Sequence, residues 1–555
     1  MPEKDLRTRC MSRWQDLDTE FSSWRDHYRE ISKVLLPRSG RFLPTENNRG
    51  DLQRYNDIYD NTGTRALRTL AGGMMAGMTS PARPWFRLTT MNPELDEAYA
   101  VKVWMGKVTA LMQMIYNKSN IYRTLQMSYE ELGAFGTSAA IVLDDYEKVI
   151  HCMPLTIGEY RIATGPRGNI NTLYRQFRMT VAALTEEFGY EHLSRQTKQR
   201  YDNGKFDDWV TVVNAIEPRD YRDLHKRDSK NMPYRSVYFE MGARDDDGIL
   251  RETGFRQFPV LAARWYVTGG DIYGTCPGME ALGDLRQLQQ QSLAKSTAIA
   301  FQANPPVVLP ADLKNNGADL QPGGSIWADN PAQAQMVRSA FDVNLRLDYL
   351  TQDMADVRQR IDQAFYKDIF MMLASGKDRM MTATEVAERH EEKMLMLGPV
   401  LERLNAELLD PLIALTFDRL VQANLLPPIP EELQGQELNV EFVSILAQAQ
   451  RAITTNAIDR FTQNLGVLVQ FKPEIADKFN SDYWVDYYAD ALGIDPQLIV
   501  SSDQVALIRQ QRAQAQQQQA QMEQMQQLSE MSKNLSGQTP STPSNAELMN
   551  QFSGY

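Results

Sequence analysis

The stretch "GMEALGDLRQLQQQSLAKSTAIAFQAN", residues 278–304, decides the architecture of this chain. It has no proline, and Pro305 and Pro306 follow it directly, so it predicts one helix about 40 Å long. A second long helix is predicted over 341–370, where apolar residues recur mostly at steps of three and four. Between the two, residues 305–331 are rich in proline, glycine and asparagine, which favours a compact loop or a small β module. The pattern therefore predicts a helical hairpin that projects from a body.

The chain before this hairpin is predicted to mix helices and strands. Apolar residues at helical spacing indicate a helix over 3–36 and another over 94–117. From residue 139 onward, short apolar or alternating runs bounded by turn residues replace that spacing. Thr180 is expected to cap a helix that ends at Phe188. The predicted strands are 139–143, 149–155, 159–163, 171–179, 209–217, 234–241, 249–255 and 258–267.

The chain after the hairpin is predicted to be mainly helical. Thr382 and Glu385 form a capping box, which opens a long helix that its two internal prolines should bend rather than end. This helix is expected to close near Asn424. Residues 429–502 are expected to be mostly helical, with one strand at 438–443. The predicted fold class is α+β and predominantly helical.

Composition limits the partners of the chain. Its formal net charge is −12, and an acidic chain cannot hold nucleic acid tightly through clustered Lys and Arg, so a DNA partner would be bound loosely. Cys10, Cys152 and Cys276 are scattered, which predicts free thiols in a reducing compartment. The sequence shows no signal-peptide pattern and no apolar run long enough to span a bilayer. We expect the chain in the cytosol where it is made, without a membrane partner.

The glycines of "LAGGMMAGMTSPARPWFRL", residues 70–88, resemble those of a phosphate-binding loop. Gly72, Gly77 and Thr79 have the spacing of G-x-x-x-x-G-K-[ST], but Met78 stands at the lysine position. A helical pattern precedes the glycines, where a phosphate-binding loop needs a strand. We interpret the stretch as a helix whose glycines let a neighbouring element approach closely.

Residues for catalysis or metal binding do not gather in the sequence. The five histidines are far apart, and His151 and Cys152, adjacent on a predicted strand, should point to opposite faces. The segment "RDDDGILRE", 244–252, resembles a calcium loop, but Arg256 stands where the bidentate glutamate belongs, so its Asp-Gly pair indicates a hairpin turn. We therefore expect no enzyme activity, no metal site and no cofactor.

Residues 503–535 contain twelve glutamines and neither glycine nor proline, so they predict a long helix. Met525, Leu528 and Leu535 fit a coiled-coil seam. Glutamines occupy the same register one and two heptads earlier: Gln511, Gln514, Gln518 and Gln521. Two interpretations stay open, a helix that lines a barrel shared with identical neighbours and a frayed glutamine-rich tail. Residues 536–555 are expected to be disordered.

Four stretches together resemble the head-to-tail connector, or portal, family of short-tailed bacteriophages. The glycine stretch at 70–88 is the first. The other three are "PLTIGEYRIATGPRGNINTLYRQFRMTVAALTEEFG", "YGTCPGMEALGDLRQLQQ" and "MTATEVAERHEEKMLMLGPVLERLNAELLDPLIALTFDRLVQANLLPPIP". The resemblance covers about residues 5–430, whereas 430–555 is similar to the family only in being helical and glutamine-rich.

The resemblance implies a portal fold, in which a ring of about twelve identical subunits occupies one capsid vertex around a DNA channel. It divides the chain into a wing (1–277), a first stem helix (278–304), a clip (305–340), a second stem helix (341–366), a tunnel loop (367–381), a long bent wing helix (382–428), a crown (429–502), a short barrel helix (503–535) and a disordered tail (536–555).

The resemblance also implies partners and contact residues. The ring would pass double-stranded DNA without sequence preference, sit among major capsid and scaffold proteins, and dock the large terminase subunit and later tail adaptor or tail tube proteins. The virion vertex, after assembly in the host cytoplasm, would be its location. The candidate residues are Lys377, Arg379, Met371 and Met372 for the channel, Lys314, Asn315, Asn316, Asp319 and Trp327 for docking, and the four glutamines Gln511, Gln514, Gln518 and Gln521 for the barrel lining.

Two other functions were weighed against a portal. A packaging ATPase would need a Walker lysine after a strand, and the sequence has none. An internal or scaffold protein built on coiled coil is the alternative that the glutamine-rich helix leaves open, and it predicts filaments or small bundles instead of closed rings. Lys377 and Arg379 could likewise be loop charges that only face solvent.

Overall fold

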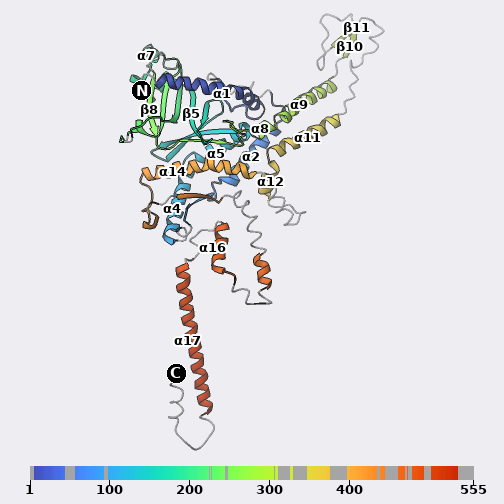
Figure 1. Cartoon of the computed structure of the whole chain (residues 1–555). Coiled ribbons are helices and arrows are strands. Elements are labelled where there is room, and N and C mark those ends of the chain that lie inside the picture. The colour runs from blue at the N-terminus through green and yellow to red at the C-terminus, as the bar shows by residue number, and fades with distance from the viewer. Residues whose placement is uncertain are drawn as a thin grey trace, which may run out of the picture.

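The computed structural model gives an α+β chain that is predominantly helical, as predicted (Figure 1). It describes residues 6–43, 57–92, 95, 98–223, 225–226, 228–243, 248–304, 307–310, 325–328, 347–375, 397–433, 435, 438–443, 461–468, 472, 478–492, 500 and 502–535. Within them, a mixed α/β body carries a projecting helical pair, and a single long helix extends from its other side.

Two antiparallel sheets form the β part of the body, and the predicted strands are confirmed. The smaller sheet has the order β3-β2-β9 and the larger the order β4-β5-β6-β7-β8. Their bounds are β2 (Thr137–Asp145), β3 (Val149–Leu155), β4 (Tyr160–Thr164), β5 (Ile170–Thr180), β6 (Trp209–Pro218), β7 (Tyr234–Glu240), β8 (Ile249–Phe255) and β9 (Val260–Arg264). The side chain of Thr180 accepts a hydrogen bond from the backbone of Ala183 and so caps α6, as predicted. The short helices beside the larger sheet are α6 (Val181–Phe188), η3 (Tyr190–His192), α7 (Arg195–Asp202) and η4 (Ser229–Asn231).

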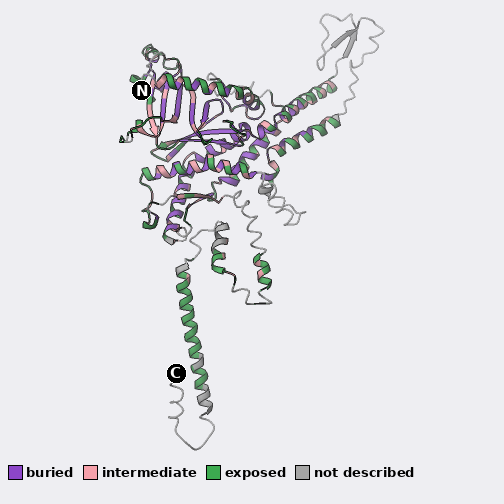
Figure 2. Cartoon of the chain, in the orientation of Figure 1, coloured by how far each residue is buried: buried purple, intermediate pink, exposed green. Residues whose placement is uncertain are grey.

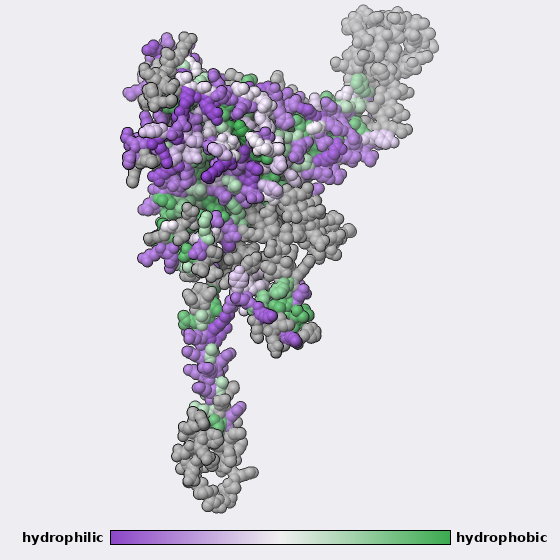
Figure 3. Space-filling model, in the orientation of Figure 1, coloured by the Kyte–Doolittle hydropathy of each residue, from purple (hydrophilic) through white to green (hydrophobic). Residues whose placement is uncertain are grey.

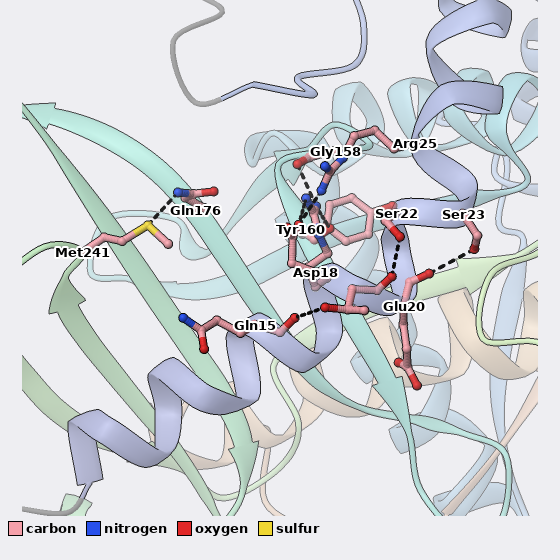
Figure 4. A network of polar contacts seen from close by, with 12 residues as sticks. Gln15, Asp18, Glu20, Ser22, Ser23, Arg25, Gly158, Tyr160, Gln176 and Met241 are labelled. Atoms are coloured by element: carbon pink, nitrogen blue, oxygen red, sulfur yellow. Dashed lines mark hydrogen bonds and ion pairs between the residues drawn. The ribbon is translucent and has the colours of Figure 1, made fainter.

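Helix α1 (Leu6–Val34) lies across the sheets and is fastened by a buried arginine of β4 (Figure 4). Arg161 is 3% exposed and donates from Nε to Asp18 of α1 at 2.9 Å. The same guanidinium donates to the carbonyls of Gly158 and Tyr160, both at 2.8 Å, and lies 3.9 Å from the centre of the Phe21 ring. A buried cation is tolerated when its donors are used and a ring face receives it. Arg161 therefore fixes α1 on the larger sheet.

The main hydrophobic core lies between the smaller sheet and the helices packed on it. It contains α2 (Thr62–Met78), α4 (Tyr99–Lys118) and α5 (Ile121–Phe135), of which α5 was not predicted as a separate helix. Ala139 and Val142 of β2 lie in the same core as Leu67 of α2. The core continues into the base of the projecting helices, so the body and the hairpin share one packed interior (Figure 2).

A short sheet joins residues that are far apart in the sequence. Strand β1 (Phe86–Thr90) pairs antiparallel with β12 (Leu438–Phe442), and Leu88 lies opposite Val440. The structure confirms the strand predicted at 438–443, but its partner had no sequence signal. The pairing attaches the chain after the long helix that ends at Gln422 to the body, with the single-turn η7 (Glu431–Leu433) just before it.

The predicted helical hairpin is confirmed in its two arms. The first arm begins with the turn α8 (Pro277–Glu280) and continues as α9 (Leu282–Ala303), and the second arm is α11 (Leu347–Ala364). The two arms pack side by side (Figure 1). Beyond them, β10 (Val307–Pro310) and β11 (Ser325–Ala328) form a parallel pair, in line with the predicted small β module.

The expected loop at 367–381 is wrong over its first part, because Lys367–Ser375 forms helix α12. Tyr366 has φ 54, and this left-handed residue ends the second arm before the chain turns into α12. Ile369 and Phe370 of this segment are buried, at 5% and 4% exposure. Their packing gives α12 an apolar face, which favours the helix over a loop. Residues 376–381 lie outside the described part of the chain.

The long helix predicted to begin at Thr382 is described from residue 397 and continues through both of its prolines, as predicted. Ahead of Pro411 it widens into a π-helical turn, η6 (Asn405–Leu409), and continues as α14 (Asp410–Gln422). Proline has no N–H for the helical ladder, and a π turn is a common local adjustment to such an interruption. Residues 382–396, with the predicted capping box, lie outside the described residues.

The C-terminal part contains α16 (Ser481–Leu492) and the isolated rod α17 (Ser502–Leu535), which is exposed along its described side chains (Figures 1 and 2). The predicted helix at 503–535 is thus confirmed. The expected disordered tail, 536–555, lies outside the described residues.

Alanine substitutions at two adjacent glycines of α2 are expected to change the free energy of unfolding in opposite directions. A Cβ at Gly73 would come within 2.2 Å of the Phe370 ring of α12, whereas a Cβ at Gly72 would meet no atom within 4 Å. Gly73→Ala should therefore lower the free energy of unfolding by about 1–3 kcal/mol through overpacking. Gly72→Ala should raise it by up to about 1 kcal/mol through helix propensity.

Chemical denaturation of the two variants checks this pair. Equal effects of both substitutions would contradict the close packing of α12 on α2. The stretch at 70–88 is thus a helix in which Gly73 permits close approach, as the sequence predicted, and it is not a phosphate-binding loop.

Candidate functional site

The base of the projecting helical pair is held by Gln289 of α9. Its side chain is 7% exposed, and its Oε1 accepts hydrogen bonds from the backbone N–H groups of Tyr59 (2.7 Å) and Asp60 (2.9 Å). Its Nε2 donates to the carbonyl of Asp60 at 2.8 Å. A buried amide is tolerated when both its oxygen and its nitrogen are bonded. Gln289 therefore ties α9 to the chain directly ahead of α2.

Asp60 joins the second arm at the same point. Its Oδ1 accepts from the N–H (2.9 Å) and hydroxyl (2.5 Å) of Thr62 at the start of α2. Its Oδ2 accepts from Nε (3.1 Å) and a terminal nitrogen (2.7 Å) of Arg358 on α11. Burial alone would raise the pKa of Asp60, but the hydrogen bonds from Thr62 and Arg358 outweigh it and lower the pKa below its ordinary value. Three helices thus meet at Asp60, α2 and α11 through its carboxylate and α9 through its backbone.

Polar contacts also join the two arms on either side of this junction. Arg360 of α11 donates from Nε to Asp284 of α9 at 3.0 Å. Asp353 of α11 accepts from the side-chain amides of Gln287, at 3.3 Å, and Gln291. Exposed contacts of this kind add little stability, but they set the register of the two arms.

The outer half of the pair leaves apolar side chains uncovered by the described residues. Ser292 is the last buried residue of α9. Beyond it, Leu293 is 44% and Ile299 45% exposed, and Tyr349 of α11 is 68% exposed. The rest of this surface is mainly hydrophilic (Figure 3). These apolar faces of the projecting pair are therefore not covered by any part of the chain that the structure describes.

A buried ion pair fixes the long helix around Glu407 on the smaller sheet. Arg264, at the end of β9, has a side chain 4% exposed and meets Glu407 of the π turn with Nε–Oε2 at 3.2 Å and a terminal nitrogen 2.6 Å from Oε1. The backbone N–H of Arg264 also donates to Oε2 at 2.9 Å, and its guanidinium donates to the carbonyl of Gly168 at 2.9 Å. Sequence reasoning missed this contact, because nothing local links residues 143 positions apart.

The structure describes three of the predicted channel and docking residues, Met371, Met372 and Trp327. Met371 lies on α12 with 53% exposure, and Met372 belongs to the same helix. Trp327 lies on β11, opposite Leu309 of β10. The other candidates, Lys377, Arg379, Lys314, Asn315, Asn316 and Asp319, lie outside the described residues. The proposed contacts of these side chains therefore stay predictions.

Helix α17 presents its predicted glutamine row to solvent. Its length of about 50 Å exceeds that of most helices in globular proteins. Met525 and Leu528, in the same register as the glutamines, are 72% and 65% exposed. A bidentate pair of Arg509 with Asp482 of α16, both distances 2.6 Å, is the contact at its base. The row consists of Gln511, Gln514, Gln518 and Gln521, all exposed.

The described residues contain few side chains arranged for catalysis or metal binding. The three cysteines are free and buried, and burial raises the pKa of Cys10 to about 11 and those of Cys152 and Cys276 to about 12, so the thiols stay protonated at neutral pH. No group of three or more metal-ligating side chains gathers in this part of the chain. Nor does any helix described here have the length and apolar character to cross a membrane.

Comparison with known proteins identifies the family. The model of the family described as "Bacteriophage head to tail connecting protein" matches residues 7–500. The chain belongs to this family. The probable portal protein of Bordetella phage BPP-1 is 58% identical over 513 residues, which cover 92% of each chain. The portal protein of Salmonella phage epsilon15 is 43% identical over 509 residues, covering 92% of this chain and 91% of that protein.

Solved structures were matched as well. A chain from the neck of an empty gene transfer agent particle is 12% identical with a TM-score of 0.34, covering 78% of this portal chain and 93% of that chain. A chain from the virion of a native gene transfer agent particle gives the same TM-score at 11% identity.

Family membership confirms the resemblance read from the sequence. The chain is a phage portal, or head-to-tail connector, of the portal vertex of the virion. The portal family is structural and not enzymatic, and it implies a ring oligomer at the capsid vertex. The scaffold-protein alternative is therefore set aside.

Proposed function

We propose that about twelve copies of this chain close into a ring whose axis carries double-stranded DNA during packaging and ejection. In this ring α9 and α11 form the stem. The observation that carries the proposal is the outer half of this pair, where Leu293, Ile299 and Tyr349 have no cover within the described chain. A neighbouring copy seated on each stem would bury them, and repetition of one heterologous contact around an axis leaves no free end.

The channel would pass DNA without holding it. A chain of net charge −12 offers few fixed contacts to phosphates, so no position along the duplex becomes a deep energy minimum. We assign transient contacts to Met371 and Met372 on α12 and to Lys377 and Arg379 after it. The segment 367–381, of which the structure describes α12, would thus face the duplex.

The remaining segments receive the partners. The clip, 305–340, with Trp327 on β11, would dock the large terminase subunit during packaging and tail adaptor or tail tube proteins afterwards. The wing, 1–277, would face the major capsid protein and scaffold. The crown, 429–502, would lead to α17, whose copies would surround a water-filled barrel lined by the glutamine row, since this row is too polar to form a dry seam.

Introducing negative charge at two stem positions tests the proposed contact between neighbouring subunits of the ring. The double substitution Leu293→Glu with Ile299→Glu should convert rings into monomers while helicity is kept, because two carboxylates would have to be buried against the neighbouring stem. Tyr146→Glu, at a fully exposed hairpin turn of the wing, is the matched control and should assemble normally. Mass photometry with circular dichroism gives both readouts. Rings of the double variant at the wild-type level would contradict the proposed stem interface.

A further inference from the structure

A cavity of about 230 Å³, lined by both apolar and polar side chains, lies away from the helical hairpin. The segment that follows α1, helix α5 and strands β2, β3 and β5 enclose it. This volume is several times the roughly 30 Å³ share of one water molecule. Its charged and polar lining includes Arg38, Arg41, Glu131, Ser138, Glu159 and Arg175.

The two carboxylates of the cavity are already satisfied by the protein. Glu131 accepts from the hydroxyl of Thr156 at 2.7 Å and from the backbone N–H of Ile157 at 3.1 Å. Glu159 accepts from Nε of Arg175 at 2.8 Å, and its other oxygen lies 3.5 Å from Arg41. Neither carboxylate therefore needs a cation from solvent.

The lining of the cavity has more hydrogen-bond donors than the described acceptors around it use. The hydroxyl of Ser138 is buried, at 1% exposure of the residue, and has no hydrogen-bond partner among the described residues. Arg38 is exposed and makes no ion pair with any described carboxylate. Arg41 uses only one terminal nitrogen, in its long contact with Glu159. A guanidinium carries five donors, so these two arginines have most of theirs free for a ligand.

We propose that this cavity binds a small tetrahedral oxyanion, of the size and charge of inorganic phosphate. Three arginines stand against two glutamates in the lining, so the site carries a positive excess. Arg38 and Arg41 supply charge-assisted hydrogen bonds. Ser138 supplies a neutral donor from the floor of the cavity, and its hydroxyl gains the partner it lacks.

The bound anion would strengthen the attachment of the segment that follows α1. The protein alone holds this segment with few hydrogen bonds. The backbone N–H of Gly40 donates to the hydroxyl of Thr156 at 2.8 Å, and that of Arg41 to the carbonyl of Ile157 at 2.9 Å. An oxyanion held by Arg38, Arg41 and Ser138 would add a bridge from this segment to β2. The anion thus acts as a structural ligand of the wing, independent of the channel.

Titration of the full-length chain with inorganic phosphate, at constant ionic strength in chloride, tests the assignment. Calorimetry and ³¹P NMR should find one saturable site per chain. The double substitution Arg38→Gln with Arg41→Gln should weaken binding by about tenfold or more, and Ser138→Ala by several-fold. Arg123→Gln, at an exposed arginine of α5 outside the cavity, should bind like wild type. Without phosphate, Ser138→Ala should be at least as stable as wild type, because it removes a buried unpaired hydroxyl.

Other results would overturn the assignment. No saturable binding, or equal binding by wild type and the double variant, would mean that phosphate contacts only the general surface. Displacement of phosphate by a short duplex at equal phosphate concentration would show that the site reads the DNA backbone instead of a free anion. If the double variant fails to fold, Arg38→Gln alone carries the test, since Arg38 is exposed.

Discussion

Replacing Glu407 with glutamine should lower the free energy of unfolding by about 3–5 kcal/mol. The substitution removes the charge that faces Arg264, whose side chain is 4% exposed, and leaves a buried guanidinium without its anion. The backbone N–H of Arg264 keeps an oxygen acceptor, so the loss reports the charge and not the shape of the side chain. Because the pair joins β9 to the π turn, the wing helix should loosen first. Denaturant unfolding followed by circular dichroism measures the change.

Glu402→Gln is the matched control for this prediction. Glu402 lies on the same helix, is exposed, and makes no ion pair with a described residue, so its substitution should change stability by less than about 0.5 kcal/mol. Replacing both partners, Arg264→Met with Glu407→Leu, should recover part of the loss, since apolar side chains carry no buried charge. A loss below about 1 kcal/mol for Glu407→Gln would contradict the assigned role of the pair.

Replacing Glu131 with glutamine should change how stability depends on pH. Burial raises the pKa of Glu131 from 4.5 to about 7, although the hydrogen bonds from Thr156 and Ile157 act in the opposite direction. A carboxyl whose pKa is higher in the folded chain contributes stability below its unfolded pKa and loses it as pH rises through the folded value. Between pH 4.5 and 8, wild type should therefore lose about 3 kcal/mol relative to Glu131→Gln.

The measurement is a set of unfolding curves for both proteins at several pH values in chloride buffers without phosphate. Glu402→Gln, at an exposed position far from Glu131 in the sequence, is the control and should keep the pH dependence of wild type. Parallel pH profiles for wild type and Glu131→Gln would contradict the burial of an ionisable carboxyl at this position.

Local patterns were sufficient to predict most of the elements. Strand β3 has the predicted bounds, 149–155, because its apolar run is limited by turns on both sides. The first arm of the hairpin was predictable because a proline-free helical stretch meets two prolines. Gly73 could also be assigned to close packing before its partner, Phe370, was known.

Other features depend on contacts that no local pattern contains. The pairing of β1 with β12 needs residues about 350 positions apart, such as Leu88 and Val440. The second arm ends where Tyr366 adopts a left-handed backbone conformation, which the presence of a tyrosine in the sequence does not predict. No local pattern singles out the carboxylate of Asp60, yet it bonds the first residue of α2 and Arg358 of α11.

Negative-stain electron microscopy of the purified full-length chain tests the central claim most directly. The account predicts closed rings with an open axis, in which the paired α9 and α11 helices of successive copies pack side by side. Class averages should show about twelve subunits. Monomers, rods or compact particles without a central hole would contradict it.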